Sequence, residues 1–122
     1  MISNYERFGP WQPKVYRNRY LLNQAKDQSC IKCGDNTPGA IVAAHYHGKY
    51  GHLFGRGTGI KADDFMTAHL CHACHWQFDA KNIEHTEYET KEARDAELFA
   101  CIALTWKRLI DSGMITIRKG DA

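Results

Sequence analysis

Two Cys-x-x-Cys pairs, Cys30 with Cys33 and Cys71 with Cys74, constrain the fold of this chain more than any other feature. Each pair forms a tight turn that directs two thiolates to one point, and two such turns complete a tetrahedral Zn²⁺ site with Zn–S distances near ~2.3 Å. The 37 residues between Cys33 and Cys71 must then fold back so that the pairs meet. The pattern predicts one structural zinc ion. A redox-active pair, and a site in which His72 replaces one cysteine, are the alternatives.

Length and composition predict a reducing compartment for these cysteines. The chain has 122 residues, which fits one domain. No apolar run approaches the ~20 residues that a membrane span needs, and the first residues lack the apolar segment of a signal peptide. We therefore expect a cytoplasmic protein without a membrane partner, in which metal binding is favoured over disulfides. Cys101, the fifth cysteine, is expected to be a small core residue.

Charge is unevenly distributed along the chain. Residues 1–61 hold nine Lys or Arg and three Asp or Glu, whereas residues 62–122 hold seven and eleven. A basic half can face a polyanion such as nucleic acid. A solvated basic surface explains the same charge, and the count alone does not separate the two interpretations.

Hydropathy and turn residues predict an α+β chain. We expect a helix from about Pro13 to Gln28, a strand over 40–47, a glycine-rich loop over 48–59, an antiparallel strand over 65–70, a helix that begins at 71–74, a helix over about 88–111 and a short strand over 114–117. The last helix presents one apolar face, with Gly113 as its stop, made of Phe99, Ile102, Ala103, Trp106, Leu109 and Ile110. Side chains alternate across a strand, so His45 and His47 share a face.

The predicted architecture is one domain over residues 1–122, built around a zinc-stapled hairpin and helix. The central motif covers residues 30–80, with a helical extension over 88–112 and a further helix before the motif. Four thiolates saturate zinc and leave no open position, so this metal would hold the fold together without activating water. Any catalysis must come from other side chains. Six of the seven histidines lie between His45 and His75, which makes them the first candidates.

The order of these elements resembles that of HNH endonucleases, which have a ββα-metal fold, and more closely that of the YbcO-like family of small prophage nucleases. The matching pieces are Ala43-Ala44-His45, the loop Gly55-Arg56-Gly57-Thr58-Gly59, and Cys71-His72-Ala73-Cys74-His75 with Asp79 four residues on. The resemblance covers about Cys30 to Ala80. It implies a phage-encoded enzyme that hydrolyses phosphodiester bonds in DNA.

The resemblance also implies roles for individual residues. His45 matches the general base that takes a proton from the attacking water, and His75 matches a ligand of the catalytic divalent metal, Mg²⁺ or Mn²⁺. Ala44 stands where the family has an acidic ligand, so Asp79 and His47 are the candidate supplementary ligands. The family's Asn near the second strand is also missing, and Asp63, Asp64 and His69 lie there instead.

Lys49, Arg56 and Lys61 lie among the loop glycines, where cations can meet phosphates. The loop could equally be a solvated connection. His75 could cap a helix or support the zinc site, and His45 could be structural. Two other functions therefore stay open: a zinc-stapled DNA-binding module without catalysis, and a zinc-built adaptor for protein partners.

Overall fold

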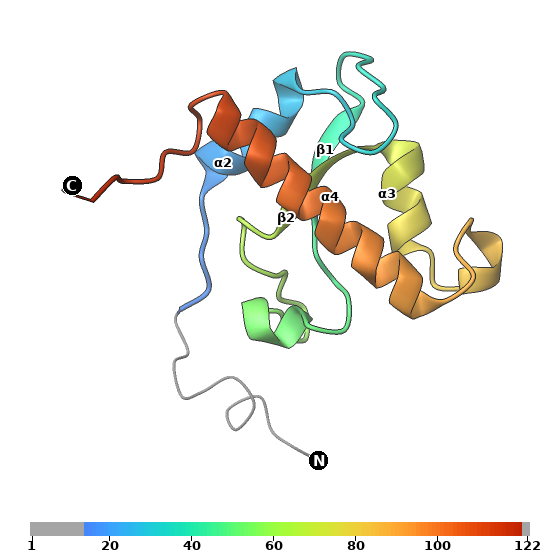
Figure 1. The fold of residues 1–122 in the computed structure, drawn as a ribbon. Coiled ribbons are helices and arrows are strands. Elements are labelled where there is room, and N and C mark those ends of the chain that lie inside the picture. The colour runs from blue at the N-terminus through green and yellow to red at the C-terminus, as the bar shows by residue number, and fades with distance from the viewer. Residues whose placement is uncertain (1–13, 121–122) are drawn as a thin grey trace.

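The computed structural model describes residues 14–120 and has α+β architecture (Figure 1). Its regular elements, in chain order, are α2 (Arg19–Asn23), a 3₁₀ helix (Gln24–Asp27), β1 (Ile41–His45), a 3₁₀ helix (Gly51–Phe54), β2 (Thr67–Cys71), α3 (His72–Asp79), a 3₁₀ helix (Ile83–His85) and α4 (Lys91–Asp111). Among the described residues, no helix combines the length and the apolar character that a membrane span requires.

Strands β1 and β2 form a two-stranded antiparallel sheet, as predicted. The register pairs Ile41 with Cys71 and His45 with Thr67, so the CxxC at the end of β2 lies beside the start of β1. The second strand begins at Thr67, two residues later than predicted, because the Met66 N–H bonds to the Asp63 carbonyl in a turn. Helix α3 follows β2 directly and confirms the predicted helix start.

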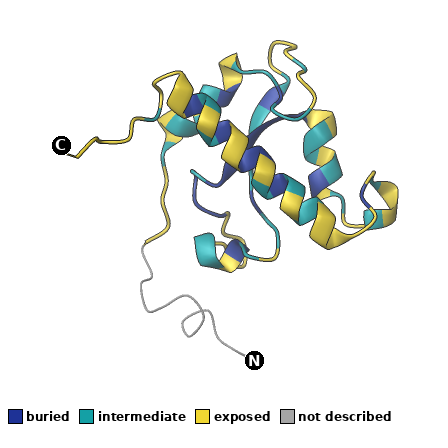
Figure 2. Cartoon of the chain, in the orientation of Figure 1, coloured by how far each residue is buried: buried dark blue, intermediate teal, exposed yellow. Residues whose placement is uncertain are grey.

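Helix α4 lies across the hairpin and covers the sheet (Figure 1). It begins at Lys91 because the Thr90 hydroxyl accepts from the Ala93 N–H at 3.1 Å, and Gly113 follows its end with φ +81°. Its inner side is buried and its outer side exposed (Figure 2). The buried side chains are Leu98, Cys101, Ile102, Thr105 and Leu109.

The predicted apolar face of α4 is only partly right. Ile102 and Leu109 are buried, and Phe99 and Trp106 are half-buried, but Ala103 and Ile110 are exposed. Thr105 takes a buried position because its hydroxyl donates to the Cys101 carbonyl and accepts from the His69 N–H. Satisfied hydrogen bonds remove most of the cost of burying that hydroxyl.

The predicted N-terminal helix is shorter than expected, and Pro13 lies outside the described residues. The chain has no regular secondary structure over 14–18, and α2 begins only after Asn18, whose side chain caps the Leu21 N–H at 3.0 Å. Side chains near β2 hold this segment: the Tyr16 N–H donates to Asp63 at 2.8 Å and the Asn18 N–H to Asp64 at 2.6 Å. Backbone donors that bond to these carboxylates are not available for a helix.

The predicted final strand over 114–117 is wrong. This segment has no strand partner among the described residues, and Ile117 is 72% exposed. The Ile115 N–H bonds to the Leu109 carbonyl at 3.0 Å, which turns the chain back against the end of α4.

Candidate functional site

The four paired cysteines converge, as their spacing predicted. Their Sγ atoms all lie within 4.8 Å of one another, and the Cys33 and Cys71 Sγ atoms are 3.6 Å apart. A tetrahedral Zn²⁺ with ~2.3 Å bonds needs sulfurs about 3.8 Å apart, so the arrangement suits the ion. The cluster could therefore hold a metal such as zinc, and all five cysteines are free of disulfides.

Backbone bonds bring the first cysteine turn onto the hairpin. The Ile31 N–H donates to the His69 carbonyl of β2 at 2.8 Å, and the Gly34 N–H closes the turn on the Cys30 carbonyl at 2.9 Å. Gly34 has φ +83°, a conformation that glycine adopts without the steric penalty of a side chain. The second turn is fixed by β2 and α3, where the Cys71 sulfur accepts from the Cys74 N–H at 3.5 Å.

The electrostatics of the cluster favour a bound cation. Burial pushes the pKa of Cys30 upward, but backbone N–H groups around its sulfur, led by that of Cys33, lower it to about 6. Burial and the neighbouring thiols raise the pKa of Cys74. A bound divalent cation offsets the cost of burying the thiolates and the repulsion between them, because the sulfurs bind a metal as thiolates.

Two residues singled out from the sequence together with the cluster, His72 and Cys101, lie outside it. His72 is exposed and does not belong to the convergent group, which consists of cysteines alone. Cys101 is buried in the core, as predicted, and burial raises its pKa to about 11.

Six of the residues singled out from the sequence lie around one cleft of about 510 Å³, which none of the four cysteines lines. The six are His45 at the end of β1, His47 two residues after it, Arg56 and Lys61 from the loop between the strands, and His75 and Asp79 from α3. We call this the histidine cleft. Lys49 lies outside it and lines the neighbouring cavity instead.

The metal-ligand candidates in the histidine cleft lie near one another without converging. The His47 Nε2 and Asp79 Oδ1 atoms are 3.4 Å apart. Within residues 14–120, the cysteine cluster is the one group of three or more His, Cys, Asp or Glu whose ligand atoms come within 4.8 Å. A divalent ion here would need the side chains of His47, His75 and Asp79 to move closer together.

His47 is kept in its neutral form. Burial lowers its pKa below the ordinary value, the nearby Asp79 carboxylate opposes this, and Arg56 and Arg94 add to the lowering. The Nε2 atom is buried and, among the described residues, has no hydrogen-bond partner. A neutral imidazole with a spare lone pair is the form that binds a metal.

Asp64 contacts the candidate site residue His45, although sequence reasoning gave it no role. Its Oδ1 lies 2.9 Å from the His45 Nε2. The Asn18 N–H at 2.6 Å and the Arg17 guanidinium at 3.2 Å also donate to its carboxylate. Burial opposes ionisation of Asp64, but the bonds from His45 and Asn18 outweigh it and lower the pKa. An ionised carboxylate only accepts, so in a neutral His45 ring the proton is on Nε2 and the lone pair is on Nδ1.

The sequence contains only a weak signal for the role of Asp64 as a partner of His45. Asp63 and Asp64 adjoin the second strand, yet both are buried, at 7% and 3% exposure. A pair of buried acids in an apolar stretch implies partners, because an unpaired buried carboxylate is costly. The partners themselves come from segments far along the chain and are visible only in the fold.

Comparisons with known proteins give no further assignment: no family model, no curated protein and no solved structure matches this chain.

Proposed function

We propose that this chain is a metal-dependent DNA endonuclease of the HNH type, similar to the YbcO-like prophage nucleases, with zinc at the cysteine cluster as its structural staple. One observation carries the proposal: His45, held by Asp64, shares a cleft with His75, Asp79 and two cations, apart from the cysteines. This is the combination that phosphodiester hydrolysis needs, namely a base, ligands for a metal and cationic contacts for phosphate.

The residues of the cleft divide the chemistry between them. His45 Nδ1 takes a proton from water, and Asp64 holds the ring and stabilises the imidazolium that forms. His75, His47 and Asp79 are the side chains that would hold Mg²⁺ or Mn²⁺. When bound, this ion neutralises charge on the scissile phosphate and on the leaving oxygen. His45 ends β1, and His75 lies on α3, the helix that begins within the second CxxC pair, so the cysteine cluster holds the element that carries His75.

Arg56 and Lys61 contribute the binding of the DNA backbone. Both side chains line the cleft and both residues are exposed. The loop that carries them is tied down by the Arg56 N–H bond to the Gly51 carbonyl at 3.0 Å. Phosphate contacts of this kind position DNA without reading its sequence.

The test is plasmid cleavage with Mg²⁺ or Mn²⁺ by wild type, His45→Ala and His75→Ala. His72→Ala is the matched control, because His72 lies on α3 near His75 but does not line the cleft. Zinc content and circular dichroism verify that each variant is folded. We expect cleavage to fall on the order of 10²–10⁴-fold in His45→Ala and to persist in the control. Full activity of folded His45→Ala would reject His45 as the base.

A second candidate is a DNA-binding module without catalysis. Two observations favour it: Ala44 supplies no carboxylate, and within residues 14–120 the ligands of the cleft do not converge as the cysteines do. Salt-dependent DNA binding by wild type, with no cleavage under any divalent ion, would select this candidate.

A further inference from the structure

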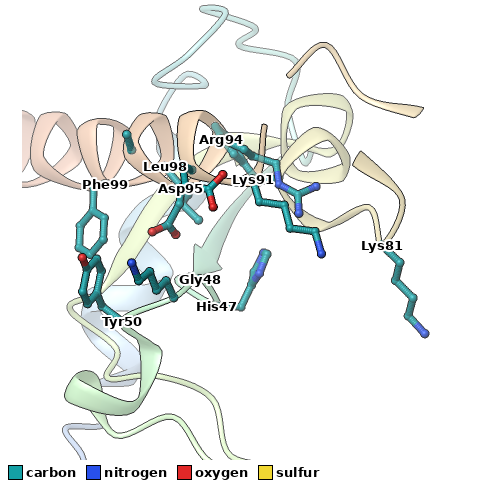
Figure 3. A pocket seen from close by; sticks show the side chains of 13 residues that line it. His47, Gly48, Tyr50, Lys81, Lys91, Arg94, Asp95, Leu98 and Phe99 are labelled. Atoms are coloured by element: carbon teal, nitrogen blue, oxygen red, sulfur yellow. The ribbon is translucent and has the colours of Figure 1, made fainter. Parts of the chain in front are cut away.

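A second and larger cavity adjoins the histidine cleft. It has a volume of about 770 Å³ and lies between the first turns of α4 and residues 47–50 (Figure 3). Aromatic and aliphatic side chains form much of its lining, including Phe78, Leu98, Phe99 and Tyr50. The size falls within the range of small-molecule sites, and the apolar lining is typical of them. We call this the α4 cavity.

His47 connects the two hollows, because its side chain lines both. Lys91 and Arg94 extend from α4 on the side where His47 lies, whereas Phe99 lies next to Tyr50 (Figure 3). A ligand bound in the histidine cleft therefore has an adjoining space that passes from a polar region to an aromatic one.

The charges around the α4 cavity suit an anionic ligand. Lys49, Lys81, Lys91 and Arg94 outnumber Glu92 and Asp95 in its lining. One Asp95 oxygen accepts from the Tyr46 hydroxyl at 2.9 Å, and the other is buried without a hydrogen-bond partner among the described residues. Cations around an aromatic recess are the arrangement by which proteins hold an unstacked nucleotide, with phosphate outside and base inside.

We propose that the α4 cavity binds an unpaired nucleobase of the DNA strand whose phosphate lies in the histidine cleft. This inference rests on the proposed function and names its substrate class: DNA with an extrahelical or single-stranded nucleotide. A base within an intact duplex is stacked and cannot enter a recess. Tyr50 and Phe99, whose ring centroids are 6.0 Å apart, provide the surface on which the base stacks.

A single substitution at an exposed position can place a bulky side chain in the cavity without changing a buried residue. Ala96 is exposed on α4 and lines the cavity, so Ala96→Trp places an indole where the base would bind. Ala103→Trp is the matched control: Ala103 is exposed on the same helix, two turns later, and lines neither hollow. Both variants add the same side chain at an exposed position of one helix.

The experiment measures fluorescence anisotropy of a short labelled duplex with one extrahelical nucleotide, against the same duplex with an abasic residue there. No divalent ion is added, so binding is read without cleavage. We expect wild type and Ala103→Trp to bind the base-containing duplex roughly 5- to 150-fold more tightly, the range that stacking of one base provides. Ala96→Trp should bind the two duplexes equally.

The two DNAs have the same backbone charge, so the ratio of their affinities reports the contribution of the base alone. Equal binding of both duplexes by wild type would overturn the inference, and so would an unchanged preference in folded Ala96→Trp. Neither result depends on cleavage, so the proposed endonuclease activity is tested separately. Conversely, a base preference in a protein that cleaves nothing with Mg²⁺ or Mn²⁺ would support this inference and reject the proposed catalysis.

Discussion

The His45 Nε2 and the Asp64 Oδ1 lie 2.9 Å apart and join the end of β1 to the segment before β2. Asp64 also accepts from the Asn18 backbone and the Arg17 guanidinium, so the N-terminal segment takes part in holding the imidazole. Because the ionised carboxylate has no proton to donate, it selects the ring tautomer with a lone pair on Nδ1. The pairing thus determines which nitrogen of the neutral ring carries the lone pair.

The first prediction tests this role of Asp64 as a positioning residue. In Asp64→Asn, the amide can donate to Nε2 and so favour the opposite tautomer of His45. We expect cleavage to fall on the order of 10²-fold or more, since removing a general base costs 10²–10⁴-fold. Long-range ¹H–¹⁵N NMR of the His45 ring should show the proton on Nδ1 in the variant and on Nε2 in wild type.

The neighbouring acid supplies the control for that experiment. Asp63 is buried like Asp64, but its Oδ1 accepts from the Tyr16 N–H and it makes no bond to His45 that the structure records. Asp63→Asn should keep the wild-type tautomer and most of the cleavage. An Asp64→Asn protein with wild-type tautomer and full cleavage would remove Asp64 from the site.

Local sequence patterns were sufficient for the parts of this fold that depend on neighbouring residues. The CxxC turns, the hairpin strands and the start of α3 each follow from a few adjacent side chains, and all were predicted. The Asp64 contacts were not, because they connect residues 19 and 46 positions apart in the chain. The Asn18 bond to Asp64, together with the Tyr16 bond to Asp63, also shortens the predicted N-terminal helix.

The face of α4 shows a different limit of sequence reasoning. The buried stripe of Leu98, Cys101, Ile102, Thr105 and Leu109 follows ideal helical spacing. A selection by hydrophobicity leaves out Thr105 and includes Ile110, which is 39% exposed. Thr105 is buried because its hydroxyl finds partners on two segments, and that information is tertiary.

The second prediction concerns the metal of the cysteine cluster. Purified under reducing conditions, the protein should contain one zinc ion per chain by elemental analysis. Cys71→Ser should lose the ion and much of its far-ultraviolet circular dichroism, because binding free energy of a structural zinc is folding free energy. Cys101→Ala should keep the zinc, since Cys101 lies outside the cluster. Metal-free wild type that is fully folded would contradict the prediction.

The third prediction separates the two sides of α4. Ile102 is 1% exposed and Leu104 is 49% exposed, so the two aliphatic residues form a matched pair on one helix. Ile102→Ala should lower the free energy of unfolding by about 2–5 kcal/mol, through lost transfer energy and a cavity. Leu104→Ala should change it by less than about 0.5 kcal/mol. Urea denaturation measures both, and equal losses would mean that α4 packs differently.

The fourth prediction concerns pH. Burial holds the pKa of His47 below its ordinary value of ~6.5. Folding therefore opposes protonation of His47. Its neutral form contributes fully to the free energy of unfolding above pH ~6.5, and this contribution is lost as the pH falls through the pKa of His47 in the folded protein. An NMR titration of the ring should give a midpoint below ~6.5. Asp79→Asn should lower it further, because the Asp79 carboxylate raises this pKa in wild type. A midpoint at or above ~6.5 would contradict burial as the cause.

The fifth prediction tests whether the cations of the histidine cleft contact DNA phosphate. Arg56 and Lys61 line the cleft, whereas Lys107 is exposed on α4 and lines neither hollow. Each phosphate contact releases condensed counterions, so losing one reduces the slope of log K against log salt by about 0.9 on duplex DNA. Arg56→Gln and Lys61→Gln should each show this reduction and weaker binding, uniformly across sequences, while Lys107→Gln keeps the wild-type slope. If all three variants shift alike, the effect reflects net charge, and the cleft does not hold the DNA backbone.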